Sequence, residues 1–176
     1  MLCGRVYSET EHEQEYKVKA AFLYNFLKFI EWPSTKLADE KTISIGIIGK
    51  NPFGKAFEPV LDKKIGDNKI ALKMFKSLEQ SKLTSEQINN IRKCHVLFIC
   101  ESEKKQFKEI MELVKDHNVL TVGDTKDFLE SGGIINFLIV DQKVSFEISN
   151  YVAKQSKLNV RSQLLRLAKK VIEEKK

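Results

Sequence analysis

Short apolar runs that alternate with helical segments are the feature that most restricts how this chain can fold. Residues 43–49 form a β-branched apolar run of the kind buried inside a sheet, and comparable runs recur at 69–75, 95–100 and 119–122. Helical segments separate them, and one begins with Thr84 and Gln87 in the spacing of a capping box. Strands that alternate with helices are typical of a mostly parallel sheet covered on both faces.

Two further apolar runs, 134–140 and 143–149, are separated only by Asp141 and Gln142. A connection this short requires an antiparallel hairpin, although neither turn residue is glycine and the turn type stays open. We therefore predict an α/β fold: a Rossmann-like, mostly parallel sheet with helices on both faces and a C-terminal antiparallel hairpin.

Helical periodicity predicts three long amphipathic helices. The first covers residues 15–32 and ends before Pro33, with Lys19 as the exception on its apolar side. The second begins at Ser102 and ends at Asn118, and the third covers 158–172. Asn51 with Pro52 is expected to start a further helix after the run 43–49.

The length of 176 residues suits one hydrophobic core, so we expect a single domain at 15–174. Residues 1–14 are expected to be a disordered segment or the remnant of a leader. No apolar run reaches the length of a membrane span.

Cys94 and Cys100 lie on one predicted strand, too far apart to form a disulfide while that strand is intact.

The charge pattern argues against nucleic acid as a partner. The net charge is +6, but the lysines are interleaved with glutamates, which is typical of solvated helix faces. Metal binding and a bound cofactor are not expected either, because His12, His95 and His117 belong to three different segments.

Gly49, Cys100 and Asp124 each follow a predicted strand, where parallel sheets bind ligands, and they are the candidates for a ligand crevice. The spacing of the glycines after residue 45 matches no nucleotide-binding motif. Cys100 is either a nucleophile or a small apolar core residue, and Asp124 is either an acid–base group or a turn residue. No catalytic constellation is expected from these residues.

Alternation in the last hairpin strand places Val144, Phe146 and Ile148 on one face and Glu147 on the other. Glu147 therefore faces either solvent or a binding partner. Asn136, the polar residue of the preceding strand, is expected to be a structural hydrogen-bonding group.

Three segments together resemble the YfiR family: "YKVKAAFLYNFLKFIEWP", "VLTVGDTKDFLESGGIINF" and "VSFEISNYVAKQSKLNVRSQLLRLA". The resemblance extends from Tyr16 to Val171. It implies a Rossmann-like α/β fold, a periplasmic location, a homodimer and no catalytic activity. It also implies a regulator that binds the periplasmic sensor domain of a membrane diguanylate cyclase, lowering cyclic-di-GMP signalling and biofilm formation.

The same resemblance implies partner-binding residues, which fall on Phe146, Glu147, Ile148 and Asn150. Ser149 departs from the family pattern, which has asparagine in its place. Two other functions stay open: a small-ligand-binding sensor module for a histidine kinase, and a divergent nucleotide-binding enzyme that uses the crevice.

Overall fold

The structure is a computed structural model that describes residues 9–37, 42–79 and 82–174 of the chain. The helices are α1 (Glu9–Phe29), α2 (Ser34–Leu37), α3 (Glu58–Leu61), α4 (Ser85–Arg92), α5 (Phe107–Val114), α6 (Asn150–Gln155) and α7 (Ser162–Leu167), with the 3₁₀ helix η1 (Glu101–Gln106) before α5. The strands are β1 (Ile30–Glu31), β2 (Thr42–Ile48), β3 (Lys64–Ile65), β4 (Asn68–Phe75), β5 (Val96–Ile99), β6 (Leu120–Gly123), β7 (Ile135–Val140), β8 (Lys143–Ser149), β9 (Asn159–Val160) and β10 (Lys170–Ile172).

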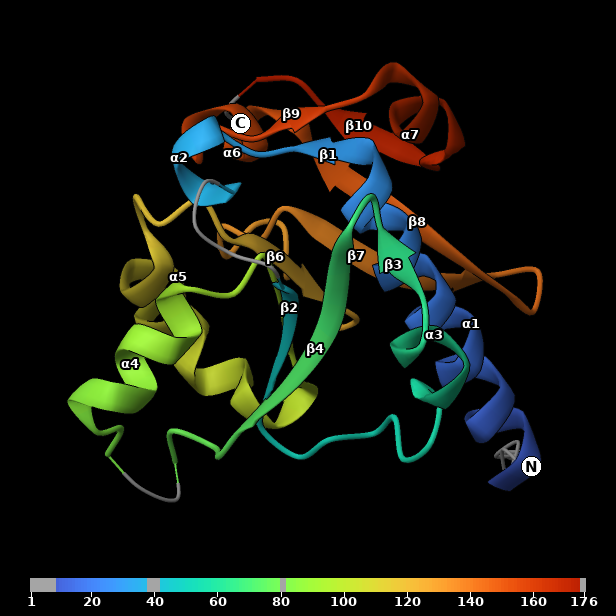
Figure 1. Ribbon diagram of the computed structural model, residues 1–176. Coiled ribbons are helices and arrows are strands. Elements are labelled where there is room, and N and C mark those ends of the chain that lie inside the picture. The colour runs from blue at the N-terminus through green and yellow to red at the C-terminus, as the bar shows by residue number, and fades with distance from the viewer. Residues whose placement is uncertain (1–8, 38–41, 80–81, 175–176) are drawn as a thin grey trace.

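An eight-stranded sheet in the order β10-β8-β7-β6-β5-β2-β4-β3 forms the centre of the molecule (Figure 1). Strands β4, β2, β5, β6 and β7 run parallel, whereas β3 pairs with β4 and β8 with β7 in the antiparallel sense. This arrangement confirms the predicted α/β fold, its mostly parallel sheet and its hairpin. The chain builds β4 on one side of β2 and β5 on the other, so the sheet reverses its strand order between β2 and β5.

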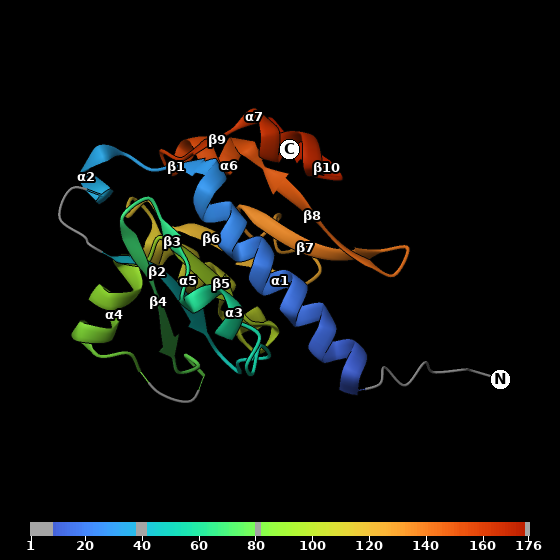
Figure 2. The same ribbon diagram turned by 45° about the vertical axis from the view of Figure 1, so that its right-hand side comes forward.

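Helix α1 covers one face of the sheet and crosses it diagonally (Figure 2). Its aromatic side chains pack against the hairpin: the Phe26 ring lies 5.7 Å from Phe137 and 5.3 Å from Phe146, between ring centroids. The opposite face is covered by α4 and α5, whose Ile91, Phe107 and Ile110 are buried in a second cluster. Helices therefore cover both faces, as expected for a buried parallel sheet.

A two-stranded sheet, separate from the main one, joins distant parts of the chain. Ile30 of β1 pairs with Val160 of β9. Beside this pair, Glu31 accepts hydrogen bonds from Asn159 (2.6 Å) and from Arg161 (2.8 Å). The end of α1 is thus fixed to the C-terminal region.

The predicted helix over 158–172 was wrong. The segment forms β9, the short helix α7 and then β10, where Val171 lies in register with Ile148. The amphipathic pattern is real, but β8 has unpaired backbone groups on its outer side, and pairing with them satisfies the backbone of residues 170–172.

Two helix starts were also wrong. Asn51 Oδ1 accepts a hydrogen bond from the Phe53 amide (2.9 Å) in a turn, and the next helix, α3, begins only at Glu58. Ser102 lies inside η1 rather than capping a long helix. The capping box of Thr84 and Gln87 is confirmed at the start of α4.

The hairpin turn has two consecutive residues with positive φ, Asp141 (48°) and Gln142 (63°). Such a turn matches the twist of the flanking strands even without glycine.

Of the expected N-terminal segment, residues 1–8 lie outside the described residues, and 9–14 belong to α1. In the described part of the chain, no helix is both long and apolar enough to cross a membrane.

Candidate functional site

Asp124, which follows β6, is the centre of a buried polar cluster at the carboxyl edge of the sheet. One of its carboxylate oxygens, Oδ2, accepts hydrogen bonds from the Tyr16 hydroxyl (2.6 Å) and from Lys19 Nζ (2.7 Å). Lys19 is 3% exposed and also forms an ion pair with Glu15 at 2.5 Å. Its ammonium group lies 4.2 Å from the centre of the Tyr16 ring. Helix α1 therefore supplies a hydroxyl, a cation and a second carboxylate around the Asp124 carboxylate.

Protonation in this cluster is set by burial and by the charge of Asp124. Burial, followed by the nearby Asp124 carboxylate, raises the pKa of the Tyr16 hydroxyl well above its ordinary value. Burial, followed by Asp124 and Glu103, raises the pKa of the Cys100 thiol to about 12. Tyr16 is therefore a hydrogen-bond donor at neutral pH, and Cys100 is a protonated thiol rather than an activated nucleophile.

Gly49, the first crevice candidate, belongs to a neighbouring network around Ser102 and Glu103 of η1. Its φ is +101°, and a Cβ there would overlap Ser102 Oγ and lie 2.7 Å from Glu103 Oε1. Glu103 is fully buried and accepts hydrogen bonds from the Ser102 hydroxyl (2.9 Å) and from the Leu78 amide (2.9 Å). Because the Lys50 amide donates to Ser102 Oγ (2.9 Å), this network joins the loops after β2, β4 and β5.

The three crevice candidates follow neighbouring strands at the carboxyl edge of the sheet, with Cys100 between Gly49 and Asp124. The Cys100 amide donates to the carbonyl of Ile48 (3.0 Å), the residue before Gly49, and burial, Asp124 and Glu103 all contribute to the raised pKa of the Cys100 thiol. Gly49 borders a hollow of about 590 Å³ that is also lined by Lys50, Phe75 and Ser102. That hollow is a cavity large enough for a small molecule.

The motif on β8 divides between the core and the surface. Phe146 is 2% exposed and Ile148 is fully buried, and both pack in the cluster beneath α1. Glu147 is partly exposed and points to the other face, where Asn136 Nδ2 donates to its Oε1 at 3.3 Å. Asn136 is thus a hydrogen-bonding group, as predicted, although its Oδ1 is buried and has no partner among the described residues.

Asn150 begins α6 next to this motif and is 5% exposed. Its Nδ2 donates to both carboxylate oxygens of Glu173, at 3.0 and 2.9 Å, and Lys154 forms an ion pair with the same carboxylate at 3.1 Å. Ser149 caps α6 by accepting a hydrogen bond from the Val152 amide (3.3 Å). Asn150 therefore fixes the C-terminal residues next to Glu147.

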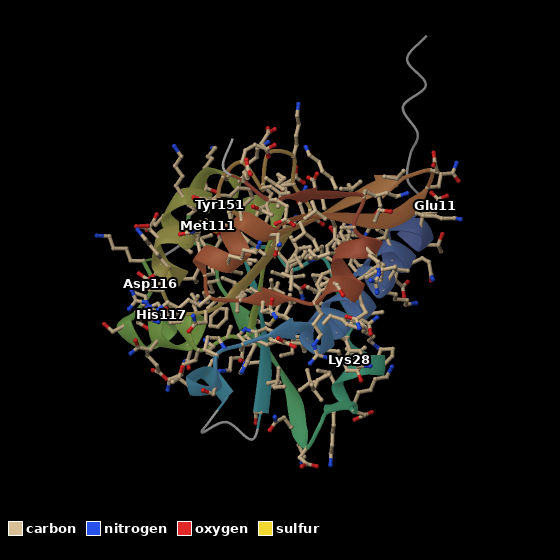
Figure 3. All side chains as sticks on the ribbon, turned by 90° about the horizontal axis from the view of Figure 1, so that it is seen from above. Glu11, Lys28, Met111, Asp116, His117 and Tyr151 are labelled. Atoms are coloured by element: carbon tan, nitrogen blue, oxygen red, sulfur yellow. The ribbon has the colours of Figure 1, made fainter. Side chains whose placement is uncertain are left out.

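The histidines do not form a metal site. His12 follows Glu11 on α1, whereas His117 lies on the opposite side of the molecule from Glu11 (Figure 3). Within the ranges that the structure describes, no group of three or more potential ligands could hold a metal ion. His95 is fully buried; burial, followed by the positive charges of Lys36 and Lys73, lowers its pKa to about 4.

Sequence reasoning missed Tyr16, Lys19 and Glu103. A signal existed for Lys19, because it is a charged residue on the apolar side of an amphipathic helix. Glu103 gave no such signal, since it lies in the polar stretch "ESEKKQ" and appeared exposed.

Comparison with known proteins identifies the family. A family model described as YfiR/HmsC-like matches residues 16–169. A search of the curated proteins finds no match.

Solved structures resemble the fold. A conserved domain protein from Vibrio cholerae superposes with a TM-score of 0.61 at 11% identity, covering 89% of this chain and 60% of that one. An ABC domain in complex with L-Trp from Streptococcus pneumoniae gives a TM-score of 0.60 at 10% identity, and the match covers 90% of this chain and 60% of that one. This chain therefore spans 60% of the length of each, and likeness at this identity establishes the fold alone.

Proposed function

This chain belongs to the YfiR/HmsC-like family, and on that premise we propose that it is a non-enzymatic regulator that acts by binding another protein. Its partner is the periplasmic sensor domain of a membrane-bound diguanylate cyclase, which it represses. The consequences are lower cyclic-di-GMP and less biofilm. The protein works in the periplasm, and it does so as a homodimer. Sedimentation of the purified chain tests the dimer directly.

The position of Glu147 is the observation that carries this proposal. Among the three consecutive motif residues Phe146, Glu147 and Ile148, the two apolar side chains belong to the core, and only the carboxylate reaches the surface. Core residues determine the fold, whereas a partly exposed carboxylate held by Asn136 is available to a cationic group on a partner. The partner-binding surface consists of Glu147 with the adjoining Lys154 and Glu173, and the buried Asn150 holds the Glu173 carboxylate in place.

The polar cluster at the carboxyl edge supports a binding role over a catalytic one. Lys19 is engaged by two carboxylates, and Tyr16 donates to Asp124. Cys100 has a pKa far above neutral. Groups held in this way stabilise the attachment of α1 to the sheet, and they are poorly suited to activate a substrate.

Charge reversal at Glu147 tests the proposal in cells. Deleting the gene is expected to raise cyclic-di-GMP, and the wild-type gene is expected to restore the low level. Glu147→Lys is expected to fail in this complementation, because reversing a charge at a contact weakens binding by about tenfold or more. Glu109→Lys, a reversal at an exposed position on α5, is the matched control and is expected to complement.

Purified proteins separate binding from folding. Glu147→Lys is expected to melt close to the wild type, since it removes one hydrogen bond worth about 1 kcal/mol. An unchanged cyclic-di-GMP level in the deletion strain, or full complementation by folded Glu147→Lys, contradicts the proposed function.

The hollow beside Gly49 favours a second candidate function, that of a small-ligand-binding sensor module for a histidine kinase. Its volume of about 590 Å³ suits a small molecule. A thermal-shift screen with amino acids and nucleotides tests it, because a ligand that binds only the native state raises the melting temperature. Under this alternative, Lys50 and Ser102 contact the ligand, and Cys100 and Asp124 do not.

A further inference from the structure

The outer side of β4 is an open strand edge at the end of the sheet opposite to β8 and β10. Strand β3 pairs only with Asn68 and Lys69. Beyond them, residues 70–75 pair with β2 on their inner side. In the part of the chain that the structure describes, no strand pairs with them on the outer side. Figure 1 shows β4 at this edge, with β3 beside only its first part.

Alternation along the strand identifies which backbone groups point outward. The Phe75 carbonyl accepts a hydrogen bond from the Gly49 amide (3.2 Å), so Phe75 directs its backbone groups toward β2. Successive residues of a strand point their backbone groups to opposite sides. Leu72 and Met74 therefore direct both N–H and C=O away from the sheet, and no hydrogen bond to these groups is found within the described residues.

The side chains leave this edge accessible. Four of the eight residues of β4 are half-buried and two, Lys69 and Met74, are exposed, whereas all but the first residue of β2 are buried. Met74 is 52% exposed. The hollow beside Gly49 begins where β4 ends and includes Met74 and Phe75 in its lining. An added strand thus meets apolar surface as well as free backbone groups.

The charge at this edge determines what kind of strand it accepts. From Lys63 to Lys76 the chain has five lysines and a single acidic residue, Asp67. Lys69 and Lys73 lie on β4 itself, on one face. A second copy of this chain would bring the same lysines against each other, which is unfavourable. Opposite charge favours a strand rich in aspartate or glutamate.

We propose that the outer edge of β4 binds an extended acidic segment of another protein, which adds to the sheet as a further strand. Backbone hydrogen bonds to Leu72 and Met74 supply the pairing, and Lys69 and Lys73 select acidic side chains. This surface is separate from Glu147, so the regulator has two contacts at opposite ends of its sheet.

Designed peptides test the edge directly. The probe is a peptide of alternating valine and glutamate, long enough to pair with residues 70–75, and its counterpart has lysine in place of glutamate. The full chain is expected to bind the Val-Glu peptide, with an affinity that falls as salt increases, and to bind the Val-Lys peptide about tenfold more weakly or worse. Equal binding of the two peptides, or no binding of the Val-Glu peptide, overturns the proposal.

Two substitutions at one position isolate the backbone donor. Met74→Pro removes the outward N–H but leaves the β2 side intact, and proline is tolerated at an edge position of this kind. It is expected to lose Val-Glu binding by about tenfold or more. Met74→Ala keeps the N–H and is expected to bind within a few-fold of the wild type. A folded Met74→Pro that binds as well as the wild type overturns the proposal.

A charge variant covers the case in which Met74→Pro does not fold. Lys73→Glu leaves the backbone unchanged and is expected to invert the preference, so that the Val-Lys peptide binds better. Retained preference for Val-Glu overturns the proposal. Glu147→Lys is expected to bind both peptides as the wild type does, so loss of the proposed function and loss of this edge are distinguishable.

If sedimentation shows a dimer that Met74→Pro dissociates, the edge belongs to a second copy, and the acidic-partner proposal is wrong.

Discussion

Lys19 lies on the buried side of an amphipathic helix, where lysine is rarely found because its charge must leave water. Two carboxylates offset that cost: Asp124 at 2.7 Å and Glu15 at 2.5 Å. Glu15 is on the same helix, but Asp124 lies 105 residues further along the chain. The contact therefore determines where α1 sits along the sheet.

Replacing this lysine is expected to be costly. Lys19→Met leaves Asp124 without its cation in a buried site, and the free energy of unfolding is expected to fall by about 3 to 5 kcal/mol. Chemical denaturation of the wild type and the variant measures this fall in the free energy of unfolding. Lys17→Met, which removes an exposed ion pair with Glu13, is the matched control and is expected to change little. Equal stabilities for the two variants would show that Lys19 has no structural role.

A pair of glycine substitutions tests the network around Glu103. Gly49 and Gly54 both have positive φ. A Cβ added at Gly49 would collide with Ser102 and Glu103, whereas a Cβ added at Gly54 would have no described atom within 4 Å. Gly54→Ala is expected to lose about 1 kcal/mol of stability from the backbone alone. Gly49→Ala adds a steric conflict and is expected to lose about 3 kcal/mol. Urea titrations of both variants compare them, and similar losses would contradict the tight packing at Gly49.

At the scale of elements, the β7–β8 hairpin has a turn whose geometry suits glycine better than the residues present. Gln142 has a φ of 63°, a conformation that costs about 1 kcal/mol for a residue with a Cβ. Gln142→Gly is therefore expected to raise the stability by up to about 1 kcal/mol. Lys143→Gly, one residue later in β8, is expected to lower it. Thermal melts of both variants test this prediction, because the melting temperature is expected to rise for Gln142→Gly and to fall for Lys143→Gly.

The sequence predicted those elements whose signals are local. The runs at 43–49, 69–75 and 143–149 are strands within about a residue of the prediction, and the capping box marks the start of α4. The tail failed because its amphipathic period is equally compatible with a helix. Only the open edge of β8, which belongs to the tertiary structure, turns residues 170–172 into β10.

The candidate site shows the same limit. Alternation placed Glu147 opposite Phe146 and Ile148, and strand ends placed Cys100 and Asp124 at one edge of the sheet. The partners of Asp124 are on α1, however, and no local pattern pairs residues more than 100 positions apart. The contacts of Gly49 with Ser102 and Glu103 depend equally on three-dimensional packing.

At the scale of the whole molecule, His95 makes the stability depend on pH. It is buried, its ring makes an edge-to-face contact with Trp32, and its Nδ1 accepts a hydrogen bond from the Ser44 amide of β2 (3.2 Å). This acceptor role requires the neutral ring. Its pKa is about 4 in the folded protein, below the ordinary value of 6.5.

A lowered pKa means that the unfolded chain binds the proton first as the pH falls. The stability contributed by neutral His95 is therefore complete above pH 6.5 and is lost between about 6.5 and 4, by roughly 3 kcal/mol. Denaturant midpoints across this range are expected to fall steeply for the wild type and less steeply for His95→Gln. His117→Gln, at a partly exposed histidine, is the control and is expected to retain the steep fall. A wild-type curve that stays flat down to pH 4 would contradict a neutral buried His95.

The pairing of β1 with β9 constrains how the chain folds during synthesis. The ribosome completes α1 early, but Asn159 and Arg161, which bind Glu31, are added about 130 residues later. The phenylalanines of α1 likewise have no hairpin to pack against until Phe137 and Phe146 have been added, and their apolar surface is exposed before that. Helix α1 therefore cannot complete both its packing and its strand pairing until most of the chain has been synthesised.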